Sequence, residues 1–341
     1  MKILIISPTQ SGIGGIARVV QNQIKFLKSK GHEVDVISSE NTPIIPIKGL
    51  KNPSFMISSY LKTKFKKNYD IVHAHNPASA LAMKNISGKK ILSLWGVFEN
   101  QVELLHGSTL GKLSGKFERN VLKHADAITV ASKDIQKYYS QLGYSPNYIP
   151  NAIDLESLPT QTERLYENQV IFVGRLSKEK GILDLLKISE KLPKEIHLII
   201  IGSGPEEDKI KKISEKHTNI HYLGYQPNER AVRLIRGSDI LIQPSLIEGG
   251  MNTTLLEAMA CKTPIITTSL KVYEDDIRHL DTAYCVKPNS PDDLLQALTK
   301  LISEKQTRLE LSENAYQIAL NHSWDEIGKQ YVTLYEKLLK S

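Results

Sequence analysis

The feature that most constrains this chain is a series of short apolar runs that alternate with segments of helical periodicity. A run that is apolar at every position is typical of a strand covered on both faces in a parallel sheet, because such a strand has no solvent-facing side. The intervening segments carry apolar residues every three to four positions, as in helices that pack on a sheet. The sequence therefore predicts an α/β fold of repeated βα units, with strands at residues 3–6, 34–37, 71–74, 91–94, 127–130, 170–173, 197–201, 221–223, 240–242 and 264–266.

The βα rhythm stops once, between residues 154 and 169, where residues 158–163 lack periodicity and are typical of a linker. We therefore expect two doubly wound domains of similar size, residues 1–160 and 161–322, facing each other across a central cleft. The last segment is typical of an amphipathic helix packed on one of the domains, because apolar side chains recur at helical spacing: Trp324, Ile327, Tyr331, Leu334, Tyr335 and Leu338.

Charge is distributed unevenly along the 341 residues. The chain has 44 Lys and Arg against 37 Asp and Glu, but residues 1–155 hold 20 basic and 10 acidic residues, so the first half is basic and the second mildly acidic. Nucleic acid is not the expected partner, since aromatic content is 6% and no nucleic-acid-binding module is recognisable. Two cysteines without metal-type spacing and no apolar stretch of about 20 residues favour a cytoplasmic location, with peripheral attachment to the inner face of the membrane left open.

A glycine-rich turn follows the first predicted strand. Gly14 and Gly15 stand between that strand and a helix, where backbone N–H groups can approach an anion. Three interpretations are open: a phosphate-facing loop, a plain tight turn, or half of the G-x-G-x-x-G fingerprint of a dinucleotide site, in which Ala17 replaces the last glycine.

Two cations flank a similar turn in the second domain. Arg175 and Lys180 lie between the strand at 170–173 and a helical pattern, so both cations and a helix N-terminus converge at the carboxyl end of a strand. This arrangement predicts an anion site, and the alternative is a solvated basic turn. Gly202 and Gly204 form another close-approach turn after the next strand.

The most specific segment is residues 243–261. It leaves a strand, passes through two glycines and enters a helix for which Asn252 or Thr253 is a good N-cap. Glu248 precedes the glycines and Glu257 lies about one turn into the helix, so both carboxylates can face one ligand. Carboxylates at such positions suit the hydroxyl groups of a sugar and a ribose.

With these segments in place, the chain resembles the GT4 family of retaining glycosyltransferases, which have the two-domain GT-B fold. The resemblance covers nearly the whole chain. Each motif is weak alone, and their number and order carry the assignment: residues 12–15, 73–75, 125–132, 149–154, 174–175 with 180–181, 202–204 and 248–257.

The resemblance implies that the C-terminal domain binds a nucleotide diphosphate sugar, that the N-terminal domain binds the acceptor, and that the last helix, residues 323–341, packs back on the N-terminal domain. Arg175 and Lys180 are expected to bind the diphosphate. Glu257 is expected to bond the ribose hydroxyls, and Glu248, one of two catalytic candidates, to contact the transferred sugar. The other residues expected to contact the donor are Gly14, Gly15, Gly202, Gly204, Gly250, Asn252, Thr253 and Thr254.

The chain departs from the family pattern at three places. Eight residues separate Glu248 from Glu257, where seven are usual. Trp95 follows the fourth strand, where many members carry His-Gly, so an indole replaces a polar contact near the reacting sugar. Residues 271–274 stand where a glycine pair is usual. These departures leave the identity of the sugar and the rate of transfer open.

Fixed cations and helix N–H groups can stabilise a departing β-phosphate without a metal, and the chain contains no Asp-x-Asp pair, so no metal or other cofactor is expected. The family resemblance implies same-face attack aided by the leaving phosphate, and we assign no general base. His75 is the second catalytic candidate, as a contact to acceptor or sugar. The alternative is that a neighbouring carbonyl satisfies its ring, and His73 is expected to be structural.

The basic first half bears on the acceptor. Lys62, Lys64, Lys66 and Lys67 are interleaved with aromatic and aliphatic residues, which suits an anionic membrane surface or an acceptor bearing phosphate, and the alternative is a solvated lysine face. We therefore expect a retaining glycosyltransferase that moves a sugar from a nucleotide diphosphate sugar to a hydroxyl acceptor, with lipid-linked acceptors included. The alternatives are a sugar-nucleotide epimerase of the same architecture and a non-catalytic binder of sugar nucleotide or lipid.

Overall fold

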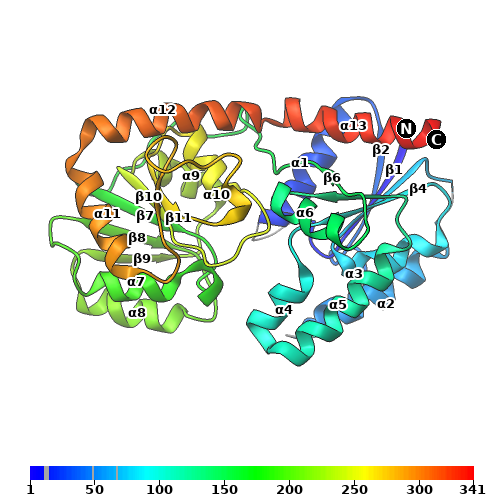
Figure 1. The fold of residues 1–341 in the computed structure, drawn as a ribbon, viewed down its shortest axis with the longest axis horizontal. Helices are drawn as coiled ribbons and strands as arrows, with labels where there is room; N and C mark the ends of the chain where they lie inside the picture. Colours follow the sequence, from blue (N-terminus) through cyan, green and yellow to red (C-terminus); the bar gives the residue numbers. More distant parts are fainter. Residues whose placement is uncertain (11–14, 48–49, 67) are drawn as a thin grey trace. The chain divides into compact units, whose positions relative to one another are not determined.

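The computed structural model describes residues 1–10, 15–47, 50–66 and 68–341 (Figure 1). The chain forms two compact units. Unit 1 consists of Met1–Ala152 together with Trp324–Ser341, and unit 2 consists of Ile153–Ser323.

Unit 1 is built on a parallel sheet with the strand order β2-β1-β3-β4-β5-β6. The side chains of residues 3–6 in β1 are fully buried, which explains why both faces of this strand are apolar. Ile3 and Ile5 pack with α1 and α13 on one face of the sheet. The elements are β1 (Lys2–Ser7), α1 (Gly15–Ser29), β2 (Glu33–Ser38), α2 (Lys51–Thr63), β3 (Ile71–His75), α3 (Pro77–Ala80), η1 (Leu81–Asn85), β4 (Lys89–Leu94), α4 (Phe98–His106), α5 (Ser108–Leu122), β5 (Ala127–Val130), α6 (Lys133–Gln141), β6 (Asn147–Tyr148) and α13 (Trp324–Lys340).

Unit 2 repeats this plan with the strand order β12-β11-β10-β7-β8-β9. Val170 and Phe172 of β7 pack with α7, α8 and α11 on one face, while Ile171 packs with α9, α10 and α12 on the other. The elements are β7 (Gln169–Val173), η2 (Lys178–Lys180), α7 (Ile182–Ser189), β8 (His197–Ile201), α8 (Glu207–Lys216), β9 (Ile220–Gly224), α9 (Asn228–Arg236), β10 (Ile240–Gln243), α10 (Thr253–Ala260), β11 (Ile265–Thr268), η3 (Lys271–Tyr273), β12 (Tyr284–Val286), α11 (Pro291–Ser303) and α12 (Lys305–Asn321).

Both units are therefore Rossmann-like and doubly wound, which confirms the predicted fold class. In unit 1 the strand order reverses between β1 and β3, and in unit 2 it reverses between β7 and β10. Ligands of such sheets bind at the carboxyl ends of the strands beside this reversal. The loops after β1, β3, β7 and β10 are thus the ones in which a site is expected.

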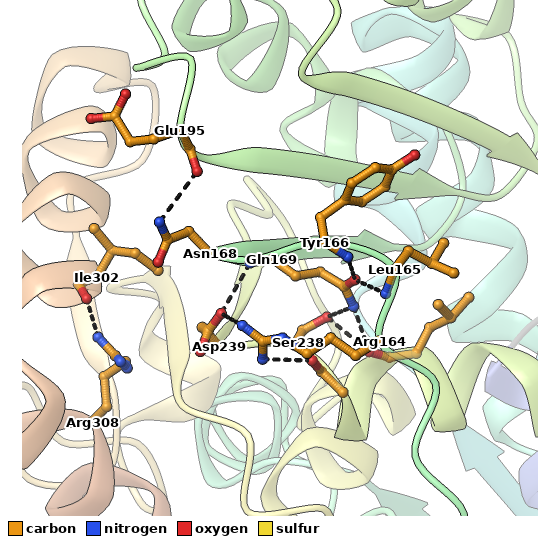
Figure 2. Close-up of polar contacts among 12 residues, drawn as sticks. Arg164, Leu165, Tyr166, Asn168, Gln169, Glu195, Ser238, Asp239, Ile302 and Arg308 are labelled. Carbon is orange, nitrogen blue, oxygen red and sulfur yellow. Dashed lines mark hydrogen bonds and ion pairs between the residues drawn. The ribbon is translucent and has the colours of Figure 1, made fainter.

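The boundary between the units differs from the sequence expectation. The sequence places it at residue 160, whereas the first unit ends at Ala152 and the following segment belongs to unit 2. Polar contacts explain the difference, because Glu163 forms an ion pair with Arg230 of α9. The buried Gln169 side chain accepts from the N–H groups of residues 165 and 166 (Figure 2). In the same network Arg164 pairs with Asp239 over 2.5 Å. The segment predicted as a linker is therefore fastened to the amino ends of the unit 2 strands.

The C-terminal helix α13 belongs to unit 1, where it packs on α1 (Figure 1). Gly328 makes the close approach possible, because a Cβ at this position would lie 2.4 Å from the ring of Phe26. Trp324, Tyr331 and Tyr335 are buried in the same contact. The apolar spacing seen in the sequence is thus the face that α13 buries in unit 1.

Candidate functional site

In unit 2, the loops after β7 and β10 lie against each other at the strand-order reversal. The N–H of Leu246 donates to the carbonyl oxygen of Glu179 over 2.8 Å. Gly181 has a φ of +72°, and a Cβ there would lie 1.8 Å from the carbonyl oxygen of Pro244. Glycine alone allows both the left-handed backbone and this approach. The contact fixes the turn after β7 against the loop after β10.

The loop contact joins two side chains that the sequence assigns to different parts of the donor. Lys180 Nζ forms an ion pair with Glu248 Oε1, and the same oxygen accepts from Ser245 Oγ at 2.8 Å and from Asn252 Nδ2 at 3.3 Å. The Glu248 side chain is only 9% exposed, so these donors largely replace water around its charge. The lysine, which is less buried, can exchange the carboxylate for a phosphate oxygen of a ligand.

Arg175 has a different environment in the same turn. Its side chain is 58% exposed and its Nη1 lies 3.9 Å from Glu179 Oε1, which also accepts from Ser177 Oγ at 2.6 Å. The guanidinium group is therefore held only loosely by its own chain, whereas Lys180 is held in the loop contact.

The N-terminus of α10 completes this edge of the sheet. Asn252 is the N-cap, one of the two candidates from the sequence, and its Oδ1 accepts from the N–H of Leu255 over 2.9 Å. Gly250, just before the cap, has a φ of +150°. Thr253 and Thr254 begin the helix, so the first-turn N–H groups and the positive end of the helix dipole lie at the carboxyl edge. This edge can offer an anion backbone donors as well as a side-chain cation.

Glu257 lies further along α10 and is 4% exposed. Its Oε1 accepts from Nδ2 of Asn228, the first residue of α9, over 2.9 Å. Sequence reasoning missed Asn228. Its only signal is the Pro227-Asn228 pair, which is typical of a helix start and does not indicate a contact 29 residues along the chain. The carboxylate that the sequence assigns to ribose is thus oriented by a neighbouring helix.

Tyr273 explains what one of the family departures does. It lies in segment 271–274, is 1% exposed, and its hydroxyl oxygen accepts from Asn252 Nδ2 at 3.2 Å. Burial raises the pKa of Tyr273 well above its ordinary value, so the hydroxyl stays neutral. The residue that stands in place of the usual glycines therefore supports the N-cap of α10.

Gly202 and Gly204 have a structural reason of their own. Gly202 has a φ of +140°, and a Cβ there would lie 1.8 Å from the carbonyl oxygen of Gly174. A Cβ on Gly204 would lie 2.4 Å from the carbonyl oxygen of Leu176. These glycines let the loops after β7 and β8 pack together, and their contact with a donor stays a prediction.

In unit 1, His73 is the centre of a buried polar network. Its Nε2 lies 2.6 Å from Ser93 Oγ, and its Nδ1 lies 2.7 Å from the hydroxyl of Tyr335 and 3.2 Å from Gln23 Nε2. Burial, followed by the neighbouring His75, lowers the pKa of His73 well below its ordinary value. The network ties β3 to β4, α1 and α13, which is the structural role expected for this histidine.

His75 lies two residues further, at the carboxyl end of β3, and is fully buried. Neither ring nitrogen bonds to any residue in the described part of the chain, so the neighbouring carbonyl of the alternative interpretation does not bond to it there. The imidazole stacks on His73 (centroids 4.6 Å apart, planes at 18°) and on the indole of Trp95 (5.7 Å and 6°). Burial lowers its pKa to about 3, so the ring is neutral at physiological pH. Its role as a catalytic contact stays a prediction.

The glycine turn after β1 is only partly described. Gly14 lies outside the described residues, and Gly15 is the first residue of α1. Their expected contact with the donor phosphates stays a prediction.

The lysine segment is less free than its sequence indicates. Lys62 Nζ donates to Oδ1 of Asn41 over 3.0 Å, and Lys66 pairs with Asp35 at 3.2 Å. Lys64 lies over the ring of Tyr60, and Lys67 lies outside the described residues. The same helix exposes apolar side chains instead, at a spacing of four: Ile57 (60%), Leu61 (49%) and, just beyond α2, Phe65 (89%).

In the part of the chain that the structure describes, no group of three or more His, Cys, Asp or Glu side chains is placed to hold a metal ion. No helix in the described ranges has the length and apolarity to cross a bilayer.

Two doubly wound units, one of them with a lysine, two buried carboxylates and a helix N-terminus at its ligand edge, define the GT-B class of transferases. The chain belongs to the GT4 family of glycosyltransferases. The model described as "Glycosyltransferase Family 4" matches residues 13–157, and the one described as "Glycosyl transferases group 1" matches residues 156–318. Together they span nearly the whole chain, so the protein is a glycosyltransferase.

Curated relatives carry the same assignment. An uncharacterized glycosyltransferase of Methanocaldococcus jannaschii is 26% identical over 297 residues, covering 82% of this chain and 71% of the relative. A phosphatidyl-myo-inositol mannosyltransferase of Mycolicibacterium smegmatis is 23% identical over 369 residues, covering 98% and 94%.

Solved structures support the fold. Sucrose-phosphate synthase from Thermosynechococcus elongatus superposes with a TM-score of 0.84 at 17% identity, covering 99% of each chain. HepE of Anabaena in complex with UDP-glucose gives a TM-score of 0.75 at 15% identity, covering 99% of this chain and 100% of the other. At these identities the likeness shows the GT-B fold alone.

Proposed function

We propose that this glycosyltransferase moves a sugar from a nucleotide diphosphate sugar to a hydroxyl acceptor with retention of anomeric configuration. The observation that carries the donor class is the cluster at the unit 2 edge, where Lys180, Glu248 and the capped N-terminus of α10 meet. A diphosphate satisfies a cation and free helix N–H groups together, which a neutral sugar cannot do. HepE, which shares the fold, is recorded in complex with UDP-glucose, and this supports a uridine nucleotide as the first donor to test.

The chemistry asks the protein to stabilise the leaving group. The bond between the anomeric carbon and the β-phosphate oxygen breaks, and a bond from the acceptor oxygen forms on the same face of the sugar. The acceptor proton passes to the departing phosphate oxygen. Lys180 and the first-turn N–H groups of α10 stabilise the charge that develops on that phosphate. When Lys180 turns to the phosphate, Glu248 keeps its bonds from Ser245 and Asn252 and is available to a sugar hydroxyl.

The acceptor side of the proposal is an anionic membrane surface that meets α2. Ile57, Leu61 and Phe65 form an exposed apolar stripe, and the exposed Lys64 lies beside it. Exposed apolar side chains next to basic ones are typical of segments that lie in a lipid interface. The basic excess of residues 1–155 complements a negatively charged leaflet. One relative is named for action on phosphatidyl-myo-inositol, which supports a lipid-linked acceptor.

The donor is tested by incubating the full chain with a panel of UDP-, GDP- and ADP-sugars, with and without acceptor extracts. The products are identified by mass spectrometry. We expect transfer that depends on the acceptor and a product with the donor's anomeric configuration by NMR. A changed sugar without an acceptor would establish an epimerase instead. Thermal stabilisation by a donor without any product would establish a binder.

The membrane surface is tested by co-sedimentation with phosphatidylglycerol vesicles and with phosphatidylcholine vesicles. We expect binding to the anionic vesicles that falls with salt. The triple variant Ile57→Ser, Leu61→Ser, Phe65→Ser should lose this binding, while the control Leu165→Ser, an exposed leucine of unit 2, should keep it. Equal sedimentation of wild type and triple variant would refute this surface.

A further inference from the structure

Three rings follow one another along a single face of the unit 1 sheet and end at its carboxyl edge. His73 and His75 lie two residues apart in β3, so both side chains point to the same face of the sheet. Trp95 follows the last residue of β4, which pairs with β3 in parallel. His73 and His75 are fully buried, whereas Trp95 is only partly buried. The three rings therefore form a column that begins in the core of unit 1 and ends with the Trp95 indole, at the edge where ligands of such sheets bind.

The lower end of the column is fixed by hydrogen bonds. His73 is held by Ser93 of the neighbouring strand and by Tyr335 of α13, at 2.6 and 2.7 Å. The His73 ring stacks on the ring of His75. The His75 ring in turn stacks on the Trp95 indole, with 6° between the planes. The orientation of the indole is thus determined by contacts that reach through the core to α13.

His75 has no polar role within the described residues, because neither ring nitrogen has a hydrogen-bond partner there. A buried imidazole without partners costs free energy compared with an apolar ring of similar size. What the ring does contribute is a flat surface against the indole. The observed contacts therefore make His75 a support for Trp95.

From this geometry we infer that Trp95 is a specificity-determining residue: its indole is the platform on which the six-membered polyol ring of the acceptor, a pyranoside or a cyclitol, stacks by its C–H face. His75 and His73 are positioning residues for this platform. The inference deepens the proposed function and rests on it, because it assigns the acceptor ring to unit 1.

The chemistry of the side chain selects this ligand class. An indole offers a large flat surface with a negative face, which attracts the polarised C–H groups of a sugar ring and repels anions. It carries no charge, so it cannot take over binding of the diphosphate. Gly96, next in the chain, has a φ of +142° that only glycine adopts easily, so the chain turns away sharply after the indole.

Binding is tested first without any transfer reaction. The chain has two tryptophans, and Trp324 is 6% exposed in the contact with α1. Fluorescence of the full chain is titrated with methyl α-glucopyranoside, methyl α-mannopyranoside and myo-inositol. We expect at least one of these three ligands to give a saturable change in fluorescence. The Trp324→Phe variant should keep this change, and the Trp95→Phe variant should lack it. No saturable change with any of them, or the same change in Trp95→Phe, would overturn the inference.

Steady-state kinetics then distinguishes binding of the acceptor by Trp95 from positioning of the indole by His75. Trp95→Ala should raise the acceptor KM about tenfold, the size of a lost aromatic contact, while the donor KM stays unchanged. His75→Ala should raise the acceptor KM less, and His75→Phe should recover most of that loss because it restores a flat ring. A fall in kcat for His75→Phe as large as for His75→Ala would instead make a ring nitrogen essential.

The two failures are distinguishable. If wild type transfers sugar and Trp95→Ala has an unchanged acceptor KM, the platform is wrong and the proposed function stands. If wild type transfers nothing from any nucleotide sugar, the proposed function fails, and the fluorescence titration still decides whether Trp95 binds a sugar ring.

Discussion

The carboxyl edges of the two sheets share a topology but carry opposite kinds of side chain. At the unit 2 edge, Lys180, Glu248 and Asn252 form a hydrogen-bonded cluster that contains an ion pair. At the unit 1 edge, His75 and Trp95 stack as neutral rings. The doubly wound sheet determines where a ligand is met, and the loop residues determine which chemistry meets it.

The same difference extends to the buried titratable groups. In unit 1 burial moves them toward their neutral forms: it lowers the pKa of His75 to about 3 and raises the pKa of Glu118 to about 7. In unit 2 the buried Glu248 is instead matched with a lysine. Burial also keeps Tyr273 of unit 2 neutral, so the difference between the units lies in the paired charge of Glu248 and not in every buried group.

Lys180→Ala should have the largest effect at the unit 2 edge. The substitution leaves Glu248 without its cation and removes a phosphate ligand, so we expect kcat/KM for the donor to fall roughly a hundredfold, or about 3 kcal/mol. The matched control is Lys178→Ala, an exposed lysine of the same turn. Equal effects of the two variants would contradict the role of the ion pair.

Gly181→Ala tests whether the unit 2 edge depends on the loop contact. Both φ (+72°) and the closeness of the Pro244 carbonyl oppose a side chain there, so we expect a loss of about 3 kcal/mol in the free energy of unfolding. Gly31→Ala is the control, because Gly31 has a φ of +80° with nothing within 4 Å of a Cβ, and it should cost about 1 kcal/mol. Urea unfolding measures both, and equal losses would show that backbone strain alone is at work.

The pH dependence of stability tests whether the buried Glu118 carboxyl of unit 1 is neutral. Glu118 has an ordinary pKa of 4.5, and burial raises it to about 7. Because the folded pKa is the higher one, the stability from this group is fully present below 4.5 and is lost as pH rises through about 7.

Glu118→Gln should therefore raise stability at pH 8 by about 3 kcal/mol and flatten the profile between pH 4.5 and 7, as followed by thermal unfolding. The exposed Glu336→Gln of α13 is the matched control and should leave the profile as it is. A profile of Glu118→Gln that still falls with rising pH would place the effect elsewhere.

The smallest expected effect is that of metal removal. If Lys180 and the α10 N-terminus suffice for the leaving phosphate, treatment with EDTA followed by desalting should leave the rate of transfer unchanged. A loss of rate that Mg²⁺ or Mn²⁺ restores would show that the charge at the unit 2 edge is completed by a cation.

The sequence predicts the ten longer strands because each contains a largely apolar run, and it misses β6 and β12. β6 has two residues, one of them Asn147, and β12 has three residues, two of them only partly buried, so neither gives a signal of useful length. The N-cap at Asn252 is local and was predictable. The contact of Lys180 with Glu248 spans 68 residues and depends on the glycine at 181, which no local pattern reveals.

The lysine segment also shows that contacts between distant parts of the chain are not visible in the local sequence. Charge counting treats Lys62 and Lys66 as free cations, but Asn41 and Asp35, which lie in or near the neighbouring strand, engage them. The exposed apolar stripe of α2 is visible only once the helix face that points away from the core is known.

The route of the chain also sets an order of assembly. Unit 2 is one uninterrupted stretch, Ile153–Ser323, whereas unit 1 lacks α13 until Trp324–Lys340 has been synthesised. On the ribosome, unit 2 is complete while His73 still waits for the Tyr335 hydroxyl. A nascent chain stalled before residue 324 thus contains a complete unit 2 and a unit 1 whose core lacks the side chains of α13.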